Sequence, residues 1–259
     1  MMNFRSVSAV VLAGGKGKRL NSKTPKVLNE IGGRPMVFYS LEKLINLGIK
    51  DIIVVIGYKA SEVQKATSFL GFNFKYALQK KPLGTGDATK AALKKVDKKT
   101  KTLLVVNGDD SAFYKVSSLK SFLNSHFKTK ATISLLTLLP KKEKPIARVI
   151  RNLSGEFMRI LEYNEYVKSS AKSKEINCGA YIFDAKWLKE NINNIKKNSL
   201  TGEYYITQLL EIAKDQHQRI NLHQLKNEAE WVGVNTQAEL HYANNMFIKS
   251  KGRNSTNRK

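Results

Sequence analysis

Glycines and cations lie close together between residues 12 and 28, in the sequence LAGGKGKRLNSKTPKVL. Gly14, Gly15 and Gly17 carry no Cβ, so the backbone N–H groups of this segment can approach an anion closely. Four cations add positive charge at the same place: Lys16, Lys18, Arg19 and Lys26. The segment lacks the spacing of a Walker loop and the third glycine of a dinucleotide fingerprint. These residue types predict a cradle for a polyphosphate, with an ordinary glycine turn between strand and helix as the alternative.

A pair of carboxylates follows an apolar run further along the chain, in the sequence VVNGDD that ends at Asp110. Mg²⁺ takes oxygen ligands, and one or two carboxylates together with substrate phosphates are enough to hold it. Asp109 is therefore a candidate ligand for a divalent cation. The alternative is that Asp109 or Asp110 caps the helix that follows, because Asp is a common N-cap residue.

A second glycine-bearing loop, LQKKPLGTGDA, follows another apolar run and ends at Ala88. Gln79 carries both a hydrogen-bond donor and an acceptor, which recognition of a pyrimidine edge requires. Gly84 and Gly86 would allow a flat base and its ribose to approach the backbone. The loop is therefore a candidate site for the nucleoside part of a nucleotide.

These three segments follow apolar runs that are typical of buried strands. Strands are expected over 7–12, 52–56, 74–78, 103–106 and 132–138, and helices over 36–47, 88–96 and 119–127. The alternation predicts a single α/β domain, residues 1–249, with a Rossmann-like, mostly parallel sheet covered by helices on both faces. Ligands bind at the carboxyl edge of such sheets, which is where the two glycine loops and Asp109 would then lie.

The pattern changes after Pro140 to shorter strands, at 147–151 and 157–161, joined by a turn at 153–155. They predict a small β hairpin, called the flap below. A polar mobile loop is expected over 168–174, a strand over 176–183, and helices over 204–213 and 236–248. Residues 250–259 contain no apolar side chain and are expected to form a disordered basic tail.

The chain has 259 residues and a mass of 29.2 kDa, and its net charge of +24 makes it strongly basic. Its hydrophobic content of 42% is enough to form a buried core. A single cysteine, Cys178, excludes an internal disulfide and a zinc site built from cysteines. Neither a signal peptide nor a long apolar run is present, so a cytoplasmic protein without membrane contact is expected. The lysines are scattered without interleaved aromatic residues, so we expect a solvated surface rather than specific nucleic-acid binding.

Eight segments, in the same order, resemble the uridylyltransferase half of the bacterial bifunctional N-acetylglucosamine-1-phosphate uridylyltransferases, within the sugar-nucleotidyltransferase superfamily. The first three are the glycine loops, at 12–28 and 79–86, and the Gly-Asp pair at 108–109. The other five are RVIR at 148–151, ILE at 160–162, EINCG at 175–179, GEYYIT at 202–207 and GVNT at 233–236. The resemblance spans residues 7–240 and implies a nucleotide-diphospho-sugar transferase fold.

The resemblance also implies a role for each matching residue. Arg19, Lys26 and Asp109 would be catalytic, the two cations by neutralising phosphate charge. Asp109 and the side-chain amide of Asn235 would ligate Mg²⁺. The nucleotide site would contain Leu12, Ala13, Gly14, Gly15, Lys26, Gln79, Gly84, Thr85, Asn107 and Asp109. The sugar site would contain Ala147, Glu162, Asn177, Tyr205 and Thr207.

Several residues depart from the family pattern. Lys18 replaces a threonine, Ser111 a proline and Asp87 a histidine. Asn107 stands where some members carry an aromatic residue, and Ala147 replaces a glycine. A backbone position that needs a positive φ disfavours a Cβ, so Ala147 bears most directly on the sugar site. These departures leave the identity of the sugar open.

The implied reaction is Mg²⁺-dependent attack of a sugar-1-phosphate, most directly N-acetylglucosamine-1-phosphate, on the α-phosphorus of UTP, giving a UDP-sugar and pyrophosphate. The alternatives are another hexose or polyol phosphate with UTP or CTP, a nucleotide-sugar-binding module without turnover, and a basic RNA-binding protein on this fold. The chain ends before the acetyltransferase β-helix of the bifunctional relatives. We therefore expect no acetyltransfer, and a monomer or weak homodimer.

Overall fold

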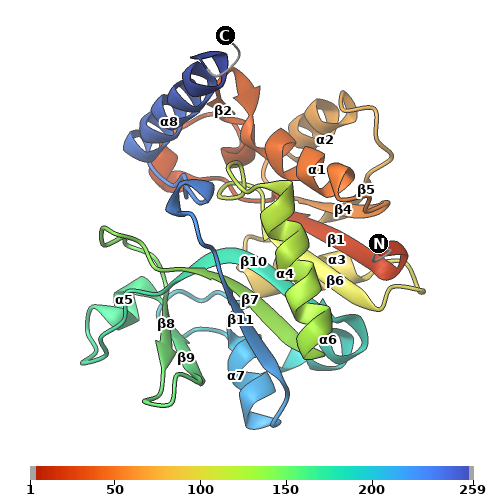
Figure 1. Ribbon diagram of the computed structural model, residues 1–259. Coiled ribbons are helices and arrows are strands. Elements are labelled where there is room, and N and C mark those ends of the chain that lie inside the picture. Colours follow the sequence, from red (N-terminus) through yellow and green to blue (C-terminus); the bar gives the residue numbers. More distant parts are fainter. Residues whose placement is uncertain (1–3, 257–259) are drawn as a thin grey trace.

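The computed structural model describes residues 4–256, whose strands form one large twisted sheet and a separate two-stranded ribbon (Figure 1). The central strands are β1 (Val7–Leu12), β4 (Asp51–Ile56), β5 (Lys75–Leu78), β6 (Thr102–Asn107), β7 (Ile133–Leu138), β10 (Ile176–Asp184) and β11 (Ile220–Gln224). Their order across the sheet is β11-β7-β10-β6-β1-β4-β5.

Most neighbouring strands of this sheet are parallel. β1 pairs in parallel with β4 and β6, β4 with β5, and β7 with β11. β10 is the exception, since it runs antiparallel to both β6 and β7. The expected mostly parallel sheet is confirmed. Because β1, β5 and β6 point the same way, the segments that follow them meet at one edge.

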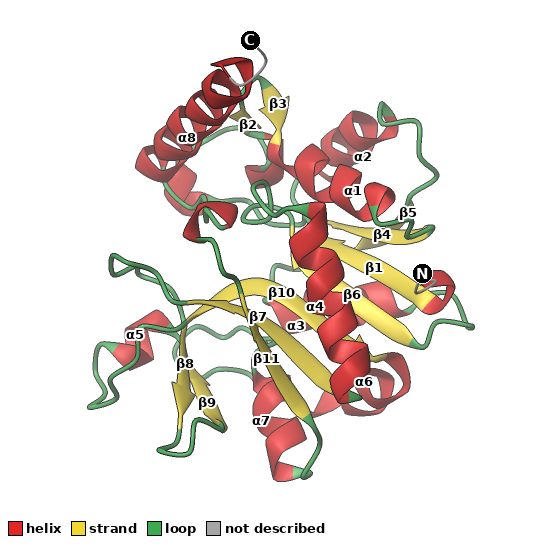
Figure 2. Ribbon diagram, in the orientation of Figure 1, coloured by secondary structure: helices red, strands yellow, loops and turns green. Residues whose placement is uncertain are grey.

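Helices cover both faces of the sheet, as Figure 2 shows. One face carries α1 (Met36–Asn46), α2 (Ala60–Ser68) and α4 (Val116–Thr129), and the other carries α3 (Thr85–Leu93), α6 (Ala185–Asn191) and α7 (Gln208–Asp215). Successive residues of β1 point to opposite faces of the sheet: Val11 packs in the core beneath α1, α2 and α4, and Val10 packs in the core beneath α3, α6 and α7. Burial on both faces explains why this strand is an unbroken apolar run.

Three of the elements lack a clear sequence pattern. α2 buries only Val63 and Thr67, β11 has no fully buried residue, and α6 is short. Such weak or short apolar patterns do not distinguish an element from a loop. The structure adds these elements to those expected from the sequence.

The helix expected over 204–213 begins only at Gln208. Tyr204 donates its backbone N–H to the carbonyl of Leu83 (2.7 Å), and Gly86 donates its own to the carbonyl of Tyr204 (2.8 Å). These bonds hold the start of segment 204–213 against the second glycine loop, so this part of the segment does not join the helix. In that loop α3 begins at Thr85, earlier than expected.

The flap is the expected hairpin, formed by β8 (Arg148–Arg151) and β9 (Phe157–Leu161). It joins the main sheet where Arg148 pairs with Ile176 of β10. A short helix, α5 (Tyr163–Tyr166), follows β9, and residues 168–174 form a loop. Figure 1 shows the flap and α5 standing beyond the end of β10.

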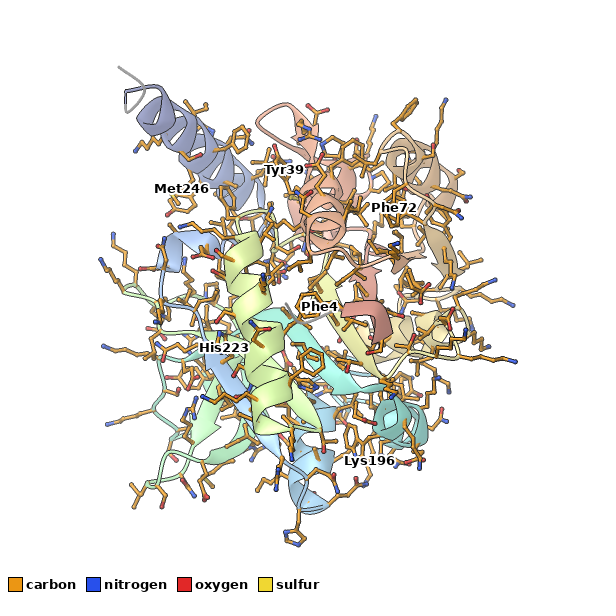
Figure 3. The ribbon with its side chains drawn as sticks, turned by 45° about the vertical axis from the view of Figure 1, so that its right-hand side comes forward. Phe4, Tyr39, Phe72, Lys196, His223 and Met246 are labelled. Atoms are coloured by element: carbon orange, nitrogen blue, oxygen red, sulfur yellow. The ribbon has the colours of Figure 1, made fainter. Side chains whose placement is uncertain are left out.

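A third, smaller core lies beside the first glycine loop. It joins that loop to the ribbon β2 (Glu30–Ile31) and β3 (Arg34–Pro35) and to the long helix α8 (Gln237–Thr256). Its fully buried members include Leu20, Ile31 and Val234. Tyr39, labelled in Figure 3, faces Phe247 of α8, with 5.7 Å between the ring centroids. Helix α8 is thereby packed against the first glycine loop and the ribbon.

The end of α8 corrects the expected C-terminal boundary. The helix continues past Ile248 to Thr256, so residues 250–256 are helical rather than a disordered tail. No proline occurs between 237 and 256, so nothing in the sequence interrupts the backbone hydrogen bonding of the helix. Residues 257–259 of the expected tail lie outside the described residues.

Cys178 is fully buried in β10 and forms no disulfide. Burial raises the pKa of its thiol well above the usual range, which removes the thiolate that a nucleophile needs. Cys178 is therefore a small core residue. Across residues 4–256, none of the helices combines the length and apolar character that crossing a bilayer requires.

Candidate active site

Two cavities open beside one another at the carboxyl edge of the sheet. The first, of about 540 Å³, lies between the two glycine loops, and the second, of about 690 Å³, lies toward the flap. The residues that line both are Arg19, Thr85, Asn107, Asp109 and Asn235. The two cavities therefore meet at side chains drawn from distant parts of the chain.

The backbone of the first glycine loop packs closely against the side chain of Lys26 at Gly17. Gly17 has a φ of +69°, and a Cβ there would lie only 2.8 Å from the Cβ of Lys26, so the loop needs glycine at this position. Ala13 does not line the cavity: it is 1% exposed, and its N–H donates to the carbonyl of Val55 (2.9 Å). Lys16 also lies outside the lining, with its ammonium 5.3 Å from the ring centroid of Tyr58.

Lys26 lines the first cavity and contacts two of the residues that line both. Its ammonium forms an ion pair with the carboxylate of Asp109 and donates to Oδ1 of Asn235 at 2.8 Å. Arg19 donates to the same amide oxygen at 3.1 Å. One carboxylate, one amide oxygen and two cations, all expected from the sequence resemblance, thus form one cluster.

The donors of this cluster match the chemistry of magnesium. The carboxylate of Asp109 and the amide oxygen of Asn235 both contact the ammonium of Lys26, and the amide oxygen also accepts from Arg19. Mg²⁺ prefers oxygen ligands of this kind and completes its coordination with water and substrate phosphates. No group of three or more His, Cys, Asp or Glu side chains suited to a metal occurs in the part of the chain described. The donor types of Asp109 and Asn235 thus fit the chemistry of this ion.

Asp110 has a different environment from Asp109. Its Oδ2 accepts a hydrogen bond from Nδ2 of Asn107 (3.0 Å), whereas its Oδ1 is buried without a partner. Burial, and next the charge of Asp109, raise the pKa of the Asp110 carboxyl well above its usual range. Neither aspartate caps the following helix, because the N-cap of α4 is Lys115, so the capping alternative is wrong.

The second glycine loop holds Gln79 in one orientation. Its Nε2 donates to the carbonyl of Gly84 (3.0 Å) and to a carboxylate oxygen of Asp87 (2.9 Å). Both partners are acceptors, so the amide nitrogen must face them and Oε1 must face away. That oxygen lies 3.2 Å from the position of a Cβ added to Gly14, and both residues line the first cavity.

The same loop is hydrogen-bonded to residues 204–207, a segment that contains two residues of the expected sugar site. Gly84 has a φ of +97°, and a Cβ there would lie 2.6 Å from the carbonyl oxygen of Tyr204, so only glycine fits. Oγ1 of Thr85 accepts the backbone N–H of Ile206 at 3.0 Å. The second glycine loop and residues 204–207 are therefore one connected unit.

The second cavity contains all five residues of the expected sugar site. Oγ1 of Thr207 donates to Oε1 of Glu162 at 3.2 Å, and Nδ2 of Asn177 donates to the hydroxyl of Tyr181 at 2.7 Å. Burial raises the pKa of the Glu162 carboxyl to about 7. Tyr205 donates its hydroxyl to Thr201 at 2.8 Å. The cavity thus presents several polar groups, including one carboxyl that titrates near neutral pH.

The departure at Ala147 carries no backbone strain. Among the described residues, those other than glycine with a positive φ are Asn21, Lys59, Lys130 and His217. Ala147 is not one of them, and its carbonyl accepts the N–H of Asn177 at 3.1 Å. The concern that a Cβ would strain this position is therefore wrong. Ser111 is likewise accommodated, because its hydroxyl donates to the carbonyl of Asn107 (2.6 Å).

Of the expected site residues, all but Ala13 line one or both cavities. The structure adds lining residues that were not expected: Glu203 in the first cavity, and Tyr181, Asn198 and Trp231 in the second. Glu203 belongs to the matching GEYYIT segment, which could have identified it. Asn198 and Trp231 lie outside the eight matching segments, and no local pattern distinguishes them.

Known proteins resemble this chain over nearly its whole length. Residues 8–250 match the family model described as nucleotidyl transferase. The bifunctional protein GlmU of Syntrophomonas wolfei is 33% identical over 247 residues, which are 95% of this chain and 54% of that protein. The same-named protein of Exiguobacterium sibiricum is 34% identical over 93% of this chain and 53% of its own length. The chain spans about half the length of these curated relatives.

A solved structure resembles this one in fold. It is a crystal structure of a Bacillus anthracis protein described as a glucose-1-phosphate thymidylyltransferase, in complex with sucrose. The TM-score is 0.78 over 93% of this chain and 95% of that chain, at 22% sequence identity. An α/β fold with this sheet is thus shared by proteins of distant sequence. Since the family model covers residues 8–250, the chain belongs to the nucleotidyl transferase family.

Proposed function

We propose that this chain joins UTP to a sugar-1-phosphate, with N-acetylglucosamine-1-phosphate as the preferred sugar, and releases pyrophosphate. The observation that carries the proposal is the contact of Lys26 with both Asp109 and Asn235 where the two cavities meet. The first cavity is suited to the nucleotide and the second to the sugar. The reacting phosphates would then lie at the cluster.

The chemistry needs charge neutralisation more than a base. The second pKa of a phosphate monoester is near ~6, so the nucleophile is already a dianion at neutral pH. Its oxygen forms a bond to the α-phosphorus of UTP while the bond from that phosphorus to the bridging β-phosphate oxygen breaks, and pyrophosphate leaves. The obstacle is repulsion between two polyanions, which Lys26 and Arg19 reduce by their positive charge.

Mg²⁺ bound by Asp109 and Asn235 would supply further positive charge to the phosphates. The chain's own contribution is to place these oxygens beside the ammonium of Lys26, which is only 13% exposed. Partial burial weakens screening by water, so each charge acts more strongly here than at the surface.

The direct test is pyrophosphate release measured with each of the four NTPs, with dTTP and with a panel of sugar-1-phosphates, with and without Mg²⁺. UTP with N-acetylglucosamine-1-phosphate and Mg²⁺ is expected to give the highest kcat/KM. Turnover that is highest with CTP or dTTP, or with another sugar phosphate, would overturn the proposed substrates. Tight binding of a UDP-sugar without turnover of any pair would overturn the enzymatic proposal.

The orientation of Gln79 supports a uracil base. Uracil carries an N–H at ring position 3, whereas cytosine has an unprotonated nitrogen there. An acceptor such as Oε1 of Gln79 suits the N–H, and a buried mismatch of acceptor with acceptor is costly. Asp87 holds this orientation by accepting from the amide nitrogen.

Replacing Asp87 with alanine is therefore expected to lower the preference for UTP over CTP by roughly tenfold, because the Gln79 amide then keeps only the Gly84 carbonyl of the two acceptors that fix its orientation. The measurement is kcat/KM for both nucleotides. Asp87→Asn is the matched control, because its amide oxygen can still accept the hydrogen bond and should preserve the preference. Unchanged selectivity in Asp87→Ala would contradict this role.

Glu162 gives a prediction on stability. Its pKa is raised from 4.5 to about 7 by burial, so the folded state binds this proton more tightly than the unfolded state. Ionisation of the Glu162 carboxyl therefore destabilises the folded state. This destabilisation is absent below about pH 4, grows between the two pKa values and is complete above about pH 7. Glu162→Gln, which cannot ionise, is therefore expected to raise the free energy of unfolding by on the order of 2–3 kcal/mol at about pH 8 and by little at about pH 4.

The same substitution is expected to raise KM for the sugar phosphate, because a carboxylate accepts hydrogen bonds from sugar hydroxyls more strongly than an amide does. Chemical denaturation at the two pH values and steady-state kinetics provide the measurements. Glu156→Gln, at an exposed position of the flap, is the control for both. A loss of stability at high pH in Glu162→Gln would show that the carboxyl is not desolvated as described.

A further inference from the structure

A third cavity, of about 370 Å³, is lined by none of the residues that line the first two. It lies between the loop that follows β7, strand β8, the end of α5 and the 168–174 loop. Four of its lining residues are cations, namely Lys141, Arg148, Lys172 and Lys174, and the single carboxylate is that of Glu143. The cavity is therefore strongly basic, and the proposed reaction makes no use of it.

Arg148 is the buried centre of this cavity. Its side chain is 1% exposed, and its guanidinium carbon lies 5.0 Å from the ring centroid of Tyr166. Nη1 donates to the carbonyl of Ile146 at 2.7 Å. Nε is buried and has no hydrogen-bond partner. A buried N–H without a partner is costly, so one side of this guanidinium lacks the acceptor it needs.

The charge of Arg148 is also poorly compensated. Its ion-pair partner Glu143 approaches Nη2 at 3.3 Å, but the side chain of Glu143 is 74% exposed. An exposed carboxylate is screened by water and contributes little to such a pair. Lys141, Lys172 and Lys174 are exposed around the opening and add positive charge. A buried charge without a matched counter-ion favours the binding of an anion.

The geometry of the guanidinium indicates which anion. Arginine binds phosphate with two parallel N–H groups, and its planar fork suits phosphate better than a lysine ammonium does. The volume lies within the range of small-molecule sites and exceeds what a bare phosphate fills. We propose that this cavity is a second ligand site, which binds the phosphate group of a small phosphate monoester through Arg148 and the surrounding lysines.

The test is a titration of the intact chain with inorganic phosphate and, separately, with glucose 6-phosphate, followed by nuclear magnetic resonance. The signal to observe is the side-chain Nε–H of Arg148, which reports on this cavity alone. Both probes are expected to shift it in a saturable manner, and the sugar phosphate is expected to bind more tightly. Sodium chloride at matched ionic strength should leave the signal in place.

Two charge-reversal variants make the test specific. The double substitution Lys141→Glu with Lys172→Glu removes two lining cations and is expected to weaken binding by roughly tenfold or more. The double substitution Lys142→Glu with Lys168→Glu changes the net charge equally at exposed positions outside this lining, and should leave the titration unchanged.

Lys26→Ala separates this site from the proposed active site, because it removes a cation there and none here. The Arg148 titration should persist in that variant, and it requires no turnover. The proposal is overturned if neither probe shifts the Arg148 signal, if the two double variants weaken binding equally, or if Lys26→Ala abolishes the shift. Each of these results would leave Arg148 with only its contacts to Tyr166, Ile146 and Glu143.

Discussion

Lys26→Ala is expected to lower kcat/KM for pyrophosphate release by roughly 10²-fold or more, because a preorganised charge on the reacting phosphates is typically worth about 3 kcal/mol. Lys26 is the residue that contacts both proposed metal ligands, through its ion pair with Asp109 and its hydrogen bond to Asn235. Steady-state kinetics with saturating Mg²⁺ provide the measurement.

The matched control is Lys23→Ala, which removes an exposed lysine from the same segment without touching either cavity. It should retain wild-type turnover. Because Lys26→Ala leaves Asp109 without its ammonium partner, thermal unfolding of the variant must be measured beside its kinetics. A folded Lys26→Ala variant with near-wild-type turnover would remove the cluster from the mechanism.

Asp109→Ala is expected to cause a loss of the same order, roughly 10²-fold in kcat/KM, and to raise the Mg²⁺ concentration needed for half-maximal rate. Asp109 is the proposed carboxylate ligand of Mg²⁺, so its loss should weaken binding of the ion. It is also the only carboxylate that contacts Lys26 among the interactions found in the described chain, so its loss should disturb the position of that ammonium. Pyrophosphate release measured across a Mg²⁺ titration separates the two effects. Asp215→Ala, at the exposed end of α7, is the control.

A double-mutant cycle then tests whether the two residues act as one unit. If Lys26 and Asp109 serve the same step, the double variant should lose much less than the product of the two single losses. Strictly multiplicative losses would show that the residues act independently. Turnover of Asp109→Ala that keeps the wild-type Mg²⁺ requirement would exclude Asp109 as a ligand of the ion.

Much of the fold could be predicted from local patterns. β1 and β6 are apolar runs because helices cover both of their faces, and such runs are visible in the sequence. The start of α7 could not be predicted in this way. Residues 204–206 look helical by pattern, but their hydrogen bonds to Leu83, Thr85 and Gly86 remove them from the helix. A competing partner distant in the sequence cannot be seen from local periodicity.

Some residues of the candidate site could likewise be predicted from the sequence, and other features of the site could not. Glycine spacing, cations and a strand-end carboxylate made Lys26 and Asp109 candidates by residue type alone, whereas Asn235 entered only through the family resemblance. The orientation of the Gln79 amide, the burial of Glu162 and the unpartnered Nε of Arg148 have no counterpart in the sequence. Each depends on which segments lie beside that side chain.

Residue order alone therefore established the α/β class, the glycine loops and the residue types proposed to bind a polyanion, because these depend on near neighbours along the chain. Tertiary structure decided that Lys26, Asp109 and Asn235 form one cluster, and that Arg148 lies in a basic cavity of its own. The physical reason is that contacts between distant segments are set by strand order and by packing across the sheet. Neither is encoded in the spacing of residues within any one segment.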